Sequence, residues 1–370
     1  MPTVDQVPSW AEAYLHLERQ AVDLSWYENQ VIPGLLPTEA CSSCASGRWA
    51  AGARTPAPPA ASSSRCGSRG HSRQTHPNGS ILGPVRMGRG WPVHPPLANT
   101  LDGESVPEMN GPYQAGTPCW IDLMVPDQQA AIDFYCDLLG WQGEVGPPET
   151  GGYAVCSLKG RPVAGIMAAM NPDGSTPDPM PPAVWTTYLA TKDVDATLEK
   201  IGDAGGKVVM PGMDVMDLGR MAVVSDPQGA VFGLWEAKSF AGAGIVNEPG
   251  ALIWNELSTT DTDAAGRFYA AALPMTPKAS EMEGADGYVE WQVGGRAVGG
   301  MMTLEKAPPG TPPHWMAYFS VDDVDSVVAA AVRGGANVLA PPFDMVAGRM
   351  SVLADPQGAV FSVIAAKMPD

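Results

Sequence analysis

The sequence predicts an α+β protein in which four βαβββ modules form two tandem domains. The first observation is an internal repeat: the stretch from Gly219 to Phe232 recurs from Gly348 to Phe361, about 130 residues later. In each copy, Asp-Pro-Gln-Gly separates two apolar runs and fits a type I turn, which predicts a β-hairpin. The hairpin is the second observation. The third is that strand-like and helix-like apolar patterns alternate in the same order four times. A duplicated structural unit explains all three.

The first domain is expected over residues 115–238. Pro118–Val125 has the composition of a strand, and Asp127 then fits the N-cap of a helix that Gly140 ends. The remaining expected elements of this half are strands at about 152–158, 161–169 and 184–191, a second helix from about Val194 to Gly205, and the hairpin around Arg220.

The second domain, over residues 250–368, repeats this series. Trp254 stands where the first half has Trp120, and Gly287-Tyr288 stands where it has Gly152-Tyr153. The matching order of elements predicts two domains of the same architecture.

The N-terminal part of the chain differs in kind. Residues 1–40 carry apolar side chains at helical spacing, which predicts a short helical segment. Residues 41–110 are rich in Ser, Gly, Pro, Ala and Arg, with seven arginines and no acidic residue between Cys44 and Leu101. Such a composition buries too little apolar surface to offset the entropy of ordering, so we expect a disordered linker. The two domains would thus follow a mostly disordered extension.

Within that extension, the run from Leu17 to Ala40, which contains Leu-Ser-Trp-Tyr-Glu-Asn, resembles part of the sensor region of certain bacterial helix-turn-helix regulators. The resemblance implies a fused remnant, and a plain amphipathic helix is the alternative. Because no helix-turn-helix precedes it, a role as a DNA-binding regulator is disfavoured.

Composition excludes several classes of protein. The net charge of −18 disfavours nucleic-acid partners, which need basic surface. The six cysteines form no even framework within a compact domain, so a disulfide scaffold is disfavoured and a reducing cytoplasm is expected. No apolar run approaches the roughly 20 residues of a membrane span. We expect a cytoplasmic protein without a membrane partner.

The four modules together resemble the vicinal oxygen chelate superfamily, which includes glyoxalase I, bleomycin-resistance proteins and extradiol dioxygenases. A strand, an Asp, a helix containing Phe134-Tyr135 or Phe268-Tyr269 and a closing Asp-Pro-x-Gly hairpin carry the resemblance over about 250 residues. It implies that modules pair so that each curled sheet forms a cup that holds a ligand, as in bacterial tandem glyoxalase-like proteins.

The resemblance also implies a divalent metal bound by His and Glu or Asp on strands that face the cup. Here the corresponding positions hold residues that are not ligands for Zn, Ni, Fe or Mn. These are Trp120, Gly165, Thr186 and Gly233 in the first domain and Trp254, Gly300, Met316 and Ser362 in the second. We therefore expect no metal cofactor.

Trp120 and Trp254 are expected to face the cups. They are candidates for an aromatic surface that stacks a flat ligand, or they fill the former metal site as core. Glycines at neighbouring positions favour the first alternative because they leave room. The other candidate ligand-binding residues are Thr186, Gly233, Gly300 and Ser362.

Asp122 and Glu256 lie two residues beyond the tryptophans, so strand periodicity places them on the same face. Each is a candidate general base with a raised pKa. The alternative is a carboxylate that is hydrogen-bonded to backbone or to a tyrosine, and Tyr188 and Tyr318 are the expected partners. These four residues are the candidate catalytic groups.

Three further features have alternative interpretations. His314 is a candidate proton shuttle or a surface histidine after two prolines. Arg220 and Arg349 fit either an anion site or an ion pair that holds the hairpin. Cys41, Cys44, Cys66, His71 and His76 match no usual zinc-finger spacing, and we interpret their clustering as accidental.

These observations lead to two functional hypotheses. The first is a protein that binds a small organic or electrophilic compound in its cups without the usual metal. The alternative is a glyoxalase- or dioxygenase-type enzyme that uses Asp122 or Glu256 with Tyr188 or Tyr318, or a non-standard metal site. Because two domains in one chain supply an internal pseudo-dimer, we expect a monomer or a homodimer.

Overall fold

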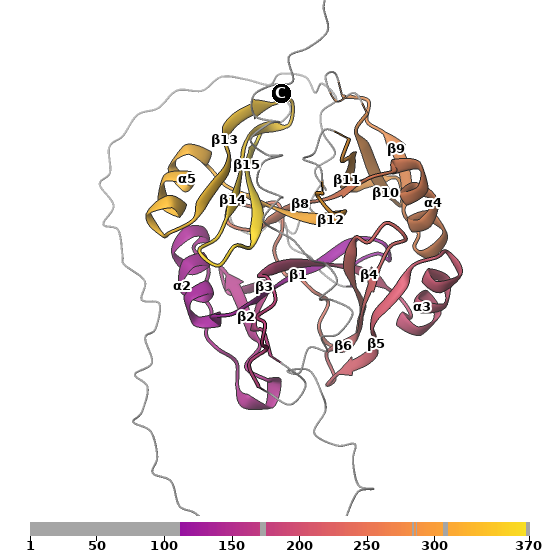
Figure 1. The fold of residues 1–370 in the computed structure, drawn as a ribbon, viewed down its shortest axis with the longest axis horizontal. Coiled ribbons are helices and arrows are strands. Elements are labelled where there is room, and N and C mark those ends of the chain that lie inside the picture. The colour runs from indigo at the N-terminus through magenta and orange to yellow at the C-terminus, as the bar shows by residue number, and fades with distance from the viewer. Residues whose placement is uncertain (1–111, 171–174, 283–284, 286, 306–309, 368–370) are drawn as a thin grey trace, which may run out of the picture.

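The computed structural model describes residues 112–170, 175–282, 285, 287–305 and 310–367 (Figure 1). The expected helical segment 1–40, the linker 41–110 and the Cys/His grouping lie outside these described residues. In the described part, the expected α+β class and the two tandem domains are confirmed.

The first domain is a curled seven-stranded sheet with strand order β2-β3-β1-β4-β7-β6-β5. Its central pair, β1 and β4, is antiparallel and joins the two modules, with Asp122 opposite Thr186. The elements are β1 (Pro118–Val125), α2 (Gln128–Leu139), η4 (Pro148–Thr150), β2 (Ala154–Leu158), β3 (Arg161–Ala168), β4 (Val184–Thr191), α3 (Val194–Asp203), β5 (Lys207–Val215), β6 (Gly219–Ser225) and β7 (Val231–Ala237).

The second domain is an eight-stranded sheet with order β13-β14-β15-β12-β8-β11-β10-β9. Its extra strand, β9, follows the helix of the third module; in the first module the corresponding pairing is a single bridge between Gln142 and Ser157. The elements are β8 (Leu252–Thr259), α4 (Thr262–Ala272), β9 (Thr276–Ala279), β10 (Val289–Val293), β11 (Arg296–Thr303), β12 (His314–Ser320), α5 (Val324–Arg333), β13 (Asn337–Met345), β14 (Gly348–Ala354) and β15 (Val360–Ala366).

An aspartate begins each of the four helices. Asp127 caps α2 as expected and accepts a hydrogen bond from the amide of Ala130 at 3.0 Å. Asp193, Asp261 and Asp323 make the equivalent bond in α3, α4 and α5. Gly140 ends α2 in the left-handed conformation at φ 73°, which a residue without Cβ adopts easily. The repeated capping residue therefore fixes where each helix leaves its strand.

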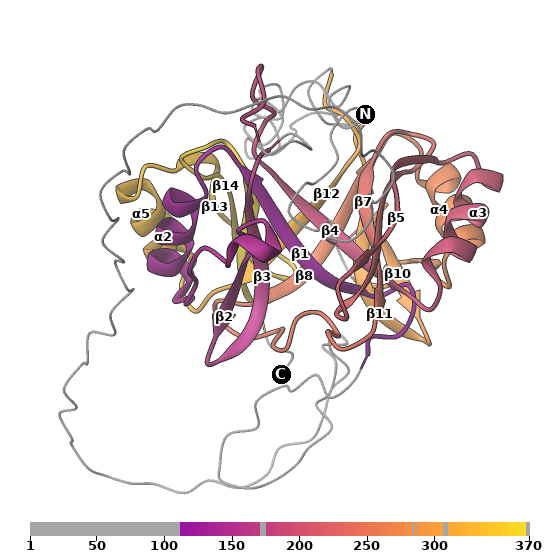
Figure 2. The ribbon, with the colours of Figure 1, turned by 90° about the horizontal axis from the view of Figure 1, so that it is seen from below.

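The two sheets pack back to back, with α2 beside α5 on one side and α3 beside α4 on the other (Figure 2). Strand alternation divides the side chains: on β4, Thr187 faces the other domain and donates a 2.7 Å hydrogen bond to Asn255, whereas Tyr188 belongs to the apolar cluster inside the first cup. Because the sheets meet through their back faces, the two cups face away from each other.

The repeated Asp-Pro-Gln-Gly hairpins connect the two domains. Each turn closes as expected, with the amide of Gly229 bonded to the carbonyl of Asp226 at 3.1 Å in the first copy. The Asp226 side chain accepts a hydrogen bond from Tyr269 of the second domain at 3.3 Å, and Asp355 accepts one from Tyr135 of the first at 3.1 Å. The hairpins are thus reciprocal interdomain contacts, a role that the sequence alone did not indicate.

The glutamine of each hairpin reinforces this contact. Gln357 accepts a hydrogen bond from the amide of Asp127 and donates one to its carbonyl, both at 2.7 Å. Gln228 contacts Thr259, Thr260 and Asp261 in the same way on the other side. Each hairpin therefore binds the strand-to-helix corner of the opposite domain.

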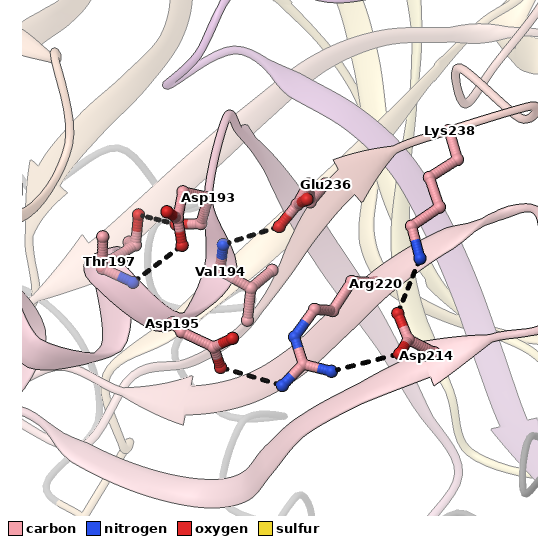
Figure 3. Close-up of polar contacts among 9 residues, drawn as sticks. Asp193, Val194, Asp195, Thr197, Asp214, Arg220, Glu236 and Lys238 are labelled. Atoms are coloured by element: carbon pink, nitrogen blue, oxygen red, sulfur yellow. Dashed lines mark hydrogen bonds and ion pairs between the residues drawn. The ribbon is translucent and has the colours of Figure 1, made fainter.

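The arginines that precede the hairpins form ion pairs, which confirms the structural interpretation. Arg220 lies 2.8 Å from Asp195 on α3 and 3.6 Å from Asp214 on β5 (Figure 3). Arg349 pairs with Asp325 through two nitrogens, at 2.7 and 3.0 Å. Both guanidinium groups hold a helix against the edge of the sheet.

Candidate functional site

The first cup contains a cavity of about 110 Å³ that is lined mainly by apolar side chains. Its walls include five aromatic residues, among them Trp120, Tyr188 and Phe240, and methionine, leucine and valine side chains from β5 to β6. Asp122 is the one acidic residue among the described residues that line it, and it is only 3 % exposed. A ligand in this cavity would meet an aromatic wall and one buried carboxyl group.

The cavity is closed on one side by the connection between the domains. Phe240 follows β7 and packs edge-on against Trp120, with ring centroids 5.0 Å apart. The indole nitrogen of Trp235 donates a 2.9 Å hydrogen bond to the Phe240 carbonyl, which holds this segment against the sheet. The interdomain connection is therefore part of the candidate site.

A chain of hydrogen bonds leads from Trp120 to the buried carboxyl group. The indole N–H of Trp120 donates to the Oη atom of Tyr153 at 2.8 Å. Tyr153 in turn donates to Asp122, at the long distance of 3.4 Å. Strand β1 supplies the tryptophan and the acid, and Tyr153 lies just before β2. The sequence therefore correctly placed Trp120 and Asp122 on one face.

Burial changes the protonation of Asp122. Removal from water raises its pKa to about 7, and hydrogen bonds from Tyr188 and Tyr153 oppose the rise. This carboxyl group is therefore divided between its protonated and ionised forms near neutral pH. It can accept or donate a proton there, as a general acid or base requires.

The second cup repeats the chain with shorter bonds. Trp254 donates to Tyr288 at 2.9 Å, and Tyr288 donates to Glu256 at 2.7 Å. Tyr318 donates to the other oxygen of Glu256 at 2.8 Å. The expected pairing of an acid with Tyr318 is confirmed here, and both oxygens of Glu256 are engaged.

The glycines do not leave the room that the sequence suggested. A Cβ atom at Gly165 would overlap the phenol oxygen of Tyr153, and one at Gly300 would overlap that of Tyr288. A Cβ atom at Gly233 would overlap the ring of Tyr188. The space is occupied by tyrosines of the chain itself, because each glycine permits close approach of a neighbouring strand.

The remaining predicted residues lie on the cup strands but contribute differently. Thr186 is buried opposite Asp122, and Met316 is buried opposite Glu256. Ser362 is fully buried beside Tyr318 in the sheet, and its hydroxyl has no hydrogen-bond partner among the residues that the structure describes. His314 is half-buried at the start of β12, where its Nδ1 atom lies 2.9 Å from the Pro312 carbonyl. Its role as a proton shuttle stays a prediction.

The residues present do not fit a divalent metal. Where the family resemblance implies ligands, the first cup has indole, hydroxyl and two glycines, and a phenol fills the space over Gly165. Across the described ranges, no three His, Cys, Asp or Glu side chains lie close enough to hold a metal ion. In the first cup, proton transfer and hydrogen bonding would therefore come from the carboxyl and phenol groups.

Sequence reasoning missed Tyr153 and Tyr288 as site residues. Their signal was the repeated Gly-Tyr pair, which we used only to align the two halves. It also missed Phe240, whose place in the site depends on the path of the connection between domains. In the described part of the chain, Cys119, Cys136 and Cys156 are buried and form no disulfide, and no helix is long and apolar enough to cross a membrane.

Comparison with known proteins identifies the family. The model for the Glyoxalase/Bleomycin resistance protein/Dioxygenase superfamily matches residues 119–234, and that for a Glyoxalase-like domain matches residues 255–364. A Mycobacterium bovis protein named "Putative glyoxylase CFP32" is 46% identical over 255 residues, which cover 68% of this chain and 95% of that protein. The "Anthracycline biosynthesis protein DnrV" of Streptomyces peucetius is 39% identical over 260 residues, or 68% of this chain and 94% of that protein.

Solved structures with a similar fold include the 2,3-dioxygenase LapB from Pseudomonas sp. KL28, with 15% identity and a TM-score of 0.48 over 69% of this chain and 94% of that chain. The Mn(II)-bound glyoxalase from Novosphingobium aromaticivorans has 17% identity and a TM-score of 0.46 over 69% of this chain and 86% of that chain. With two family models matched in tandem and relatives of high identity, this chain belongs to the glyoxalase/bleomycin resistance protein/dioxygenase superfamily.

Proposed function

We propose that the protein binds a small organic compound in its first cup without a divalent metal. The observation that carries this proposal is the cavity of about 110 Å³, with its aromatic wall and the single buried acid Asp122. A cavity of roughly 150 Å³ in another protein holds benzene, so the enclosed part here suits one ring or one short polar group. A larger ligand would extend out of the cup.

Two further arguments support a ligand of this class. Apolar walls with one or two polar groups are typical of small-molecule sites, in which the polar groups fix orientation. The names of the relatives refer to a glyoxylase and to anthracycline biosynthesis. Both are consistent with an organic ligand that carries carbonyl or hydroxyl oxygens. The residues that would contact it first are Trp120, Asp122 and Tyr188.

A thermal-shift screen tests binding. The panel consists of aldehydes, aromatic ketones and anthracyclines, and we expect at least one compound to raise the melting temperature. Val155, which lines the cavity and is 48% exposed, is replaced by Trp to obstruct the cup. Val208, which is 47% exposed and is not among the cavity-lining residues, is replaced by Trp as the matched control. Stabilisation should disappear only in the first variant; no stabiliser across the panel would contradict the proposal.

Elemental analysis tests the metal part separately. Protein purified without chelators should contain far less than one Ni, Zn, Fe or Mn atom per domain. About one tightly bound atom per domain would contradict a metal-free function, whatever the result of the ligand screen.

A second candidate is an enzyme that moves a proton on the bound compound. The observation that favours it is the pKa of Asp122, which burial raises to about 7. A base whose pKa lies near the working pH removes a proton from the carbon next to a carbonyl group most effectively. Deuterium exchange at that carbon, followed by NMR in D2O, should depend on Asp122 and stop in the Asp122→Asn variant. Exchange that continues unchanged would remove this acid from the mechanism.

A further inference from the structure

Both cups have glycine at a position where the family resemblance implies a metal ligand. In the first cup, Gly165 is covered by the phenol oxygen of Tyr153, and in the second, Gly300 is covered by that of Tyr288. Any side chain at either glycine would displace the phenol. Glycine and tyrosine therefore form a spatial pair in each domain.

The tryptophan of each cup determines which way the phenol donates. The indole N–H of Trp120 takes one acceptor lone pair of the Tyr153 oxygen at 2.8 Å, and Trp254 does the same to Tyr288 at 2.9 Å. Because an indole N–H is a donor only, the phenol proton must point elsewhere. It points to Glu256 at 2.7 Å in the second cup, but in the first the Asp122 oxygen is 3.4 Å away. An O–H···O bond of ordinary strength is 2.5–3.0 Å long, so the Tyr153 hydroxyl makes only a weak hydrogen bond to Asp122.

We propose that the Tyr153 phenol replaces the metal as the group that holds a ligand oxygen in the first cup, and that Gly165 is the residue that admits it. Tyr153 lines the cavity and would donate its hydrogen bond to a carbonyl or hydroxyl oxygen of the bound compound. The Trp120 indole positions the phenol for this. In the second cup the equivalent donor is committed to Glu256, so Tyr288 serves as an internal comparison. The ligand role rests on the proposed function, whereas the Gly165–Tyr153 pairing does not.

A double-mutant cycle tests the pairing without any ligand. Gly165→Ala should lower the melting temperature in the wild-type background, because the new Cβ atom displaces the phenol. In the Tyr153→Ala background, which removes the phenol, the same change should cost much less, because only the Cβ atom of Asp122, 3.0 Å away, then remains close. Gly202→Ala is the matched control: Gly202 lies in α3 with open space where a Cβ atom would be, so this change should not lower stability in either background. An equal cost of Gly165→Ala in both backgrounds would overturn the pairing.

A pair of isosteric probes tests the hydrogen bond. Acetophenone has a carbonyl oxygen where α-methylstyrene has a CH2 group, and both are the size of one substituted ring. Tyr153→Phe, which keeps the ring, should weaken acetophenone binding by about two- to tenfold and leave α-methylstyrene unchanged. Tyr288→Phe should change neither dissociation constant. Ligand-observed NMR titrations supply both values.

The outcomes separate the inference from the proposed function. Equal weakening of both probes by Tyr153→Phe, or weakening of neither, would overturn the hydrogen-bonding role. Failure of both probes to bind the wild-type protein would count against the proposed function and the hydrogen bond together. The double-mutant cycle would then still decide whether Gly165 and Tyr153 form a pair.

Discussion

The two cups share a Trp–Tyr–acid chain, yet the acid is held differently in each. In the second cup Glu256 accepts hydrogen bonds of 2.7 and 2.8 Å from Tyr288 and Tyr318. In the first cup the shorter Asp122 is 3.4 Å from Tyr153. One methylene group accounts for the difference: the longer glutamate comes within 2.7 Å of Tyr288, whereas Asp122 hydrogen-bonds to Tyr188 but stays 3.4 Å from Tyr153. In the second cup both oxygens of the acid therefore accept short hydrogen bonds from tyrosines, whereas in the first cup the long Tyr153 bond leaves that phenol as a donor for a ligand.

The largest expected effect concerns the protonation of Asp122. Because its folded pKa of about 7 lies above the unfolded value near 4, the folded state binds the proton more tightly. Its contribution to stability is fully present below about pH 4 and is lost as the pH rises to about 7. The free energy of unfolding of the wild type should fall relative to Asp122→Asn by up to about 4 kcal/mol over this range.

Urea unfolding of both proteins between pH 4 and pH 8 measures this difference. Other buried acids, such as Asp226 and Asp355, are common to both proteins and cancel. A difference that does not change with pH would show that Asp122 is not perturbed.

The tyrosines should differ in their contributions to stability. Tyr288→Phe and Tyr318→Phe each remove a short hydrogen bond to a buried acid and should cost about 1–3 kcal/mol of unfolding free energy. Tyr153→Phe and Tyr288→Phe both remove the acceptor of a tryptophan N–H, but Tyr153→Phe removes only a long bond to the acid and should therefore cost about 1 kcal/mol less than Tyr288→Phe. Chemical denaturation of the three variants at one pH makes the comparison. Equal costs would show that the bond lengths do not distinguish the cups.

Replacing each acid by the acid of the other cup should change how tightly the tyrosines of that cup hold it. Asp122→Glu should let the carboxyl group accept a short hydrogen bond from Tyr153 in addition to the one from Tyr188, and so weaken ligand binding to the first cup by about tenfold, or 1.4 kcal/mol. Glu256→Asp in the second cup is the reciprocal change and should leave that binding unaltered. Isothermal titration of any compound from the screen gives both values. Unchanged affinity in Asp122→Glu would separate binding from the hydrogen bonds of the acid.

The repeated arginines should have the smallest effect. Arg220→Met and Arg349→Met each break an ion pair with an exposed aspartate and should cost less than about 1 kcal/mol. Neither should alter ligand binding in either cup. A selective loss of binding in one of them would show that its guanidinium group contacts the ligand after all.

The sequence predicted the fold well because its signals are local. The repeated Asp-Pro-Gln-Gly turn and the capping aspartates, such as Asp127, depend on residues within four positions of each other. Strand alternation also placed Trp120 and Asp122 on one face of β1. Such features can be recognised in the sequence without knowledge of the tertiary structure.

The parts of the site that sequence reasoning missed depend on distant segments. Tyr153 reaches Gly165 only because β2 and β3 pair in one particular register, which includes a bulge between Cys156 and Ser157. Phe240 enters the first cup through the connection between the domains. The hairpin contact between Asp226 and Tyr269 requires that the sheets pack back to back. The repeated Gly-Tyr pair marks Tyr153 and Tyr288 in the sequence, but no local pattern shows which residues they or Phe240 contact.

The most direct test is ligand binding to protein treated with a chelator. A compound from the screen is titrated into untreated protein, into protein dialysed against EDTA, and into dialysed protein supplied with Mn2+, Ni2+ or Zn2+. Metal-free binding predicts the same dissociation constant in all samples, with loss only in Val155→Trp. Binding that disappears after chelation and returns with one of the metals would contradict it.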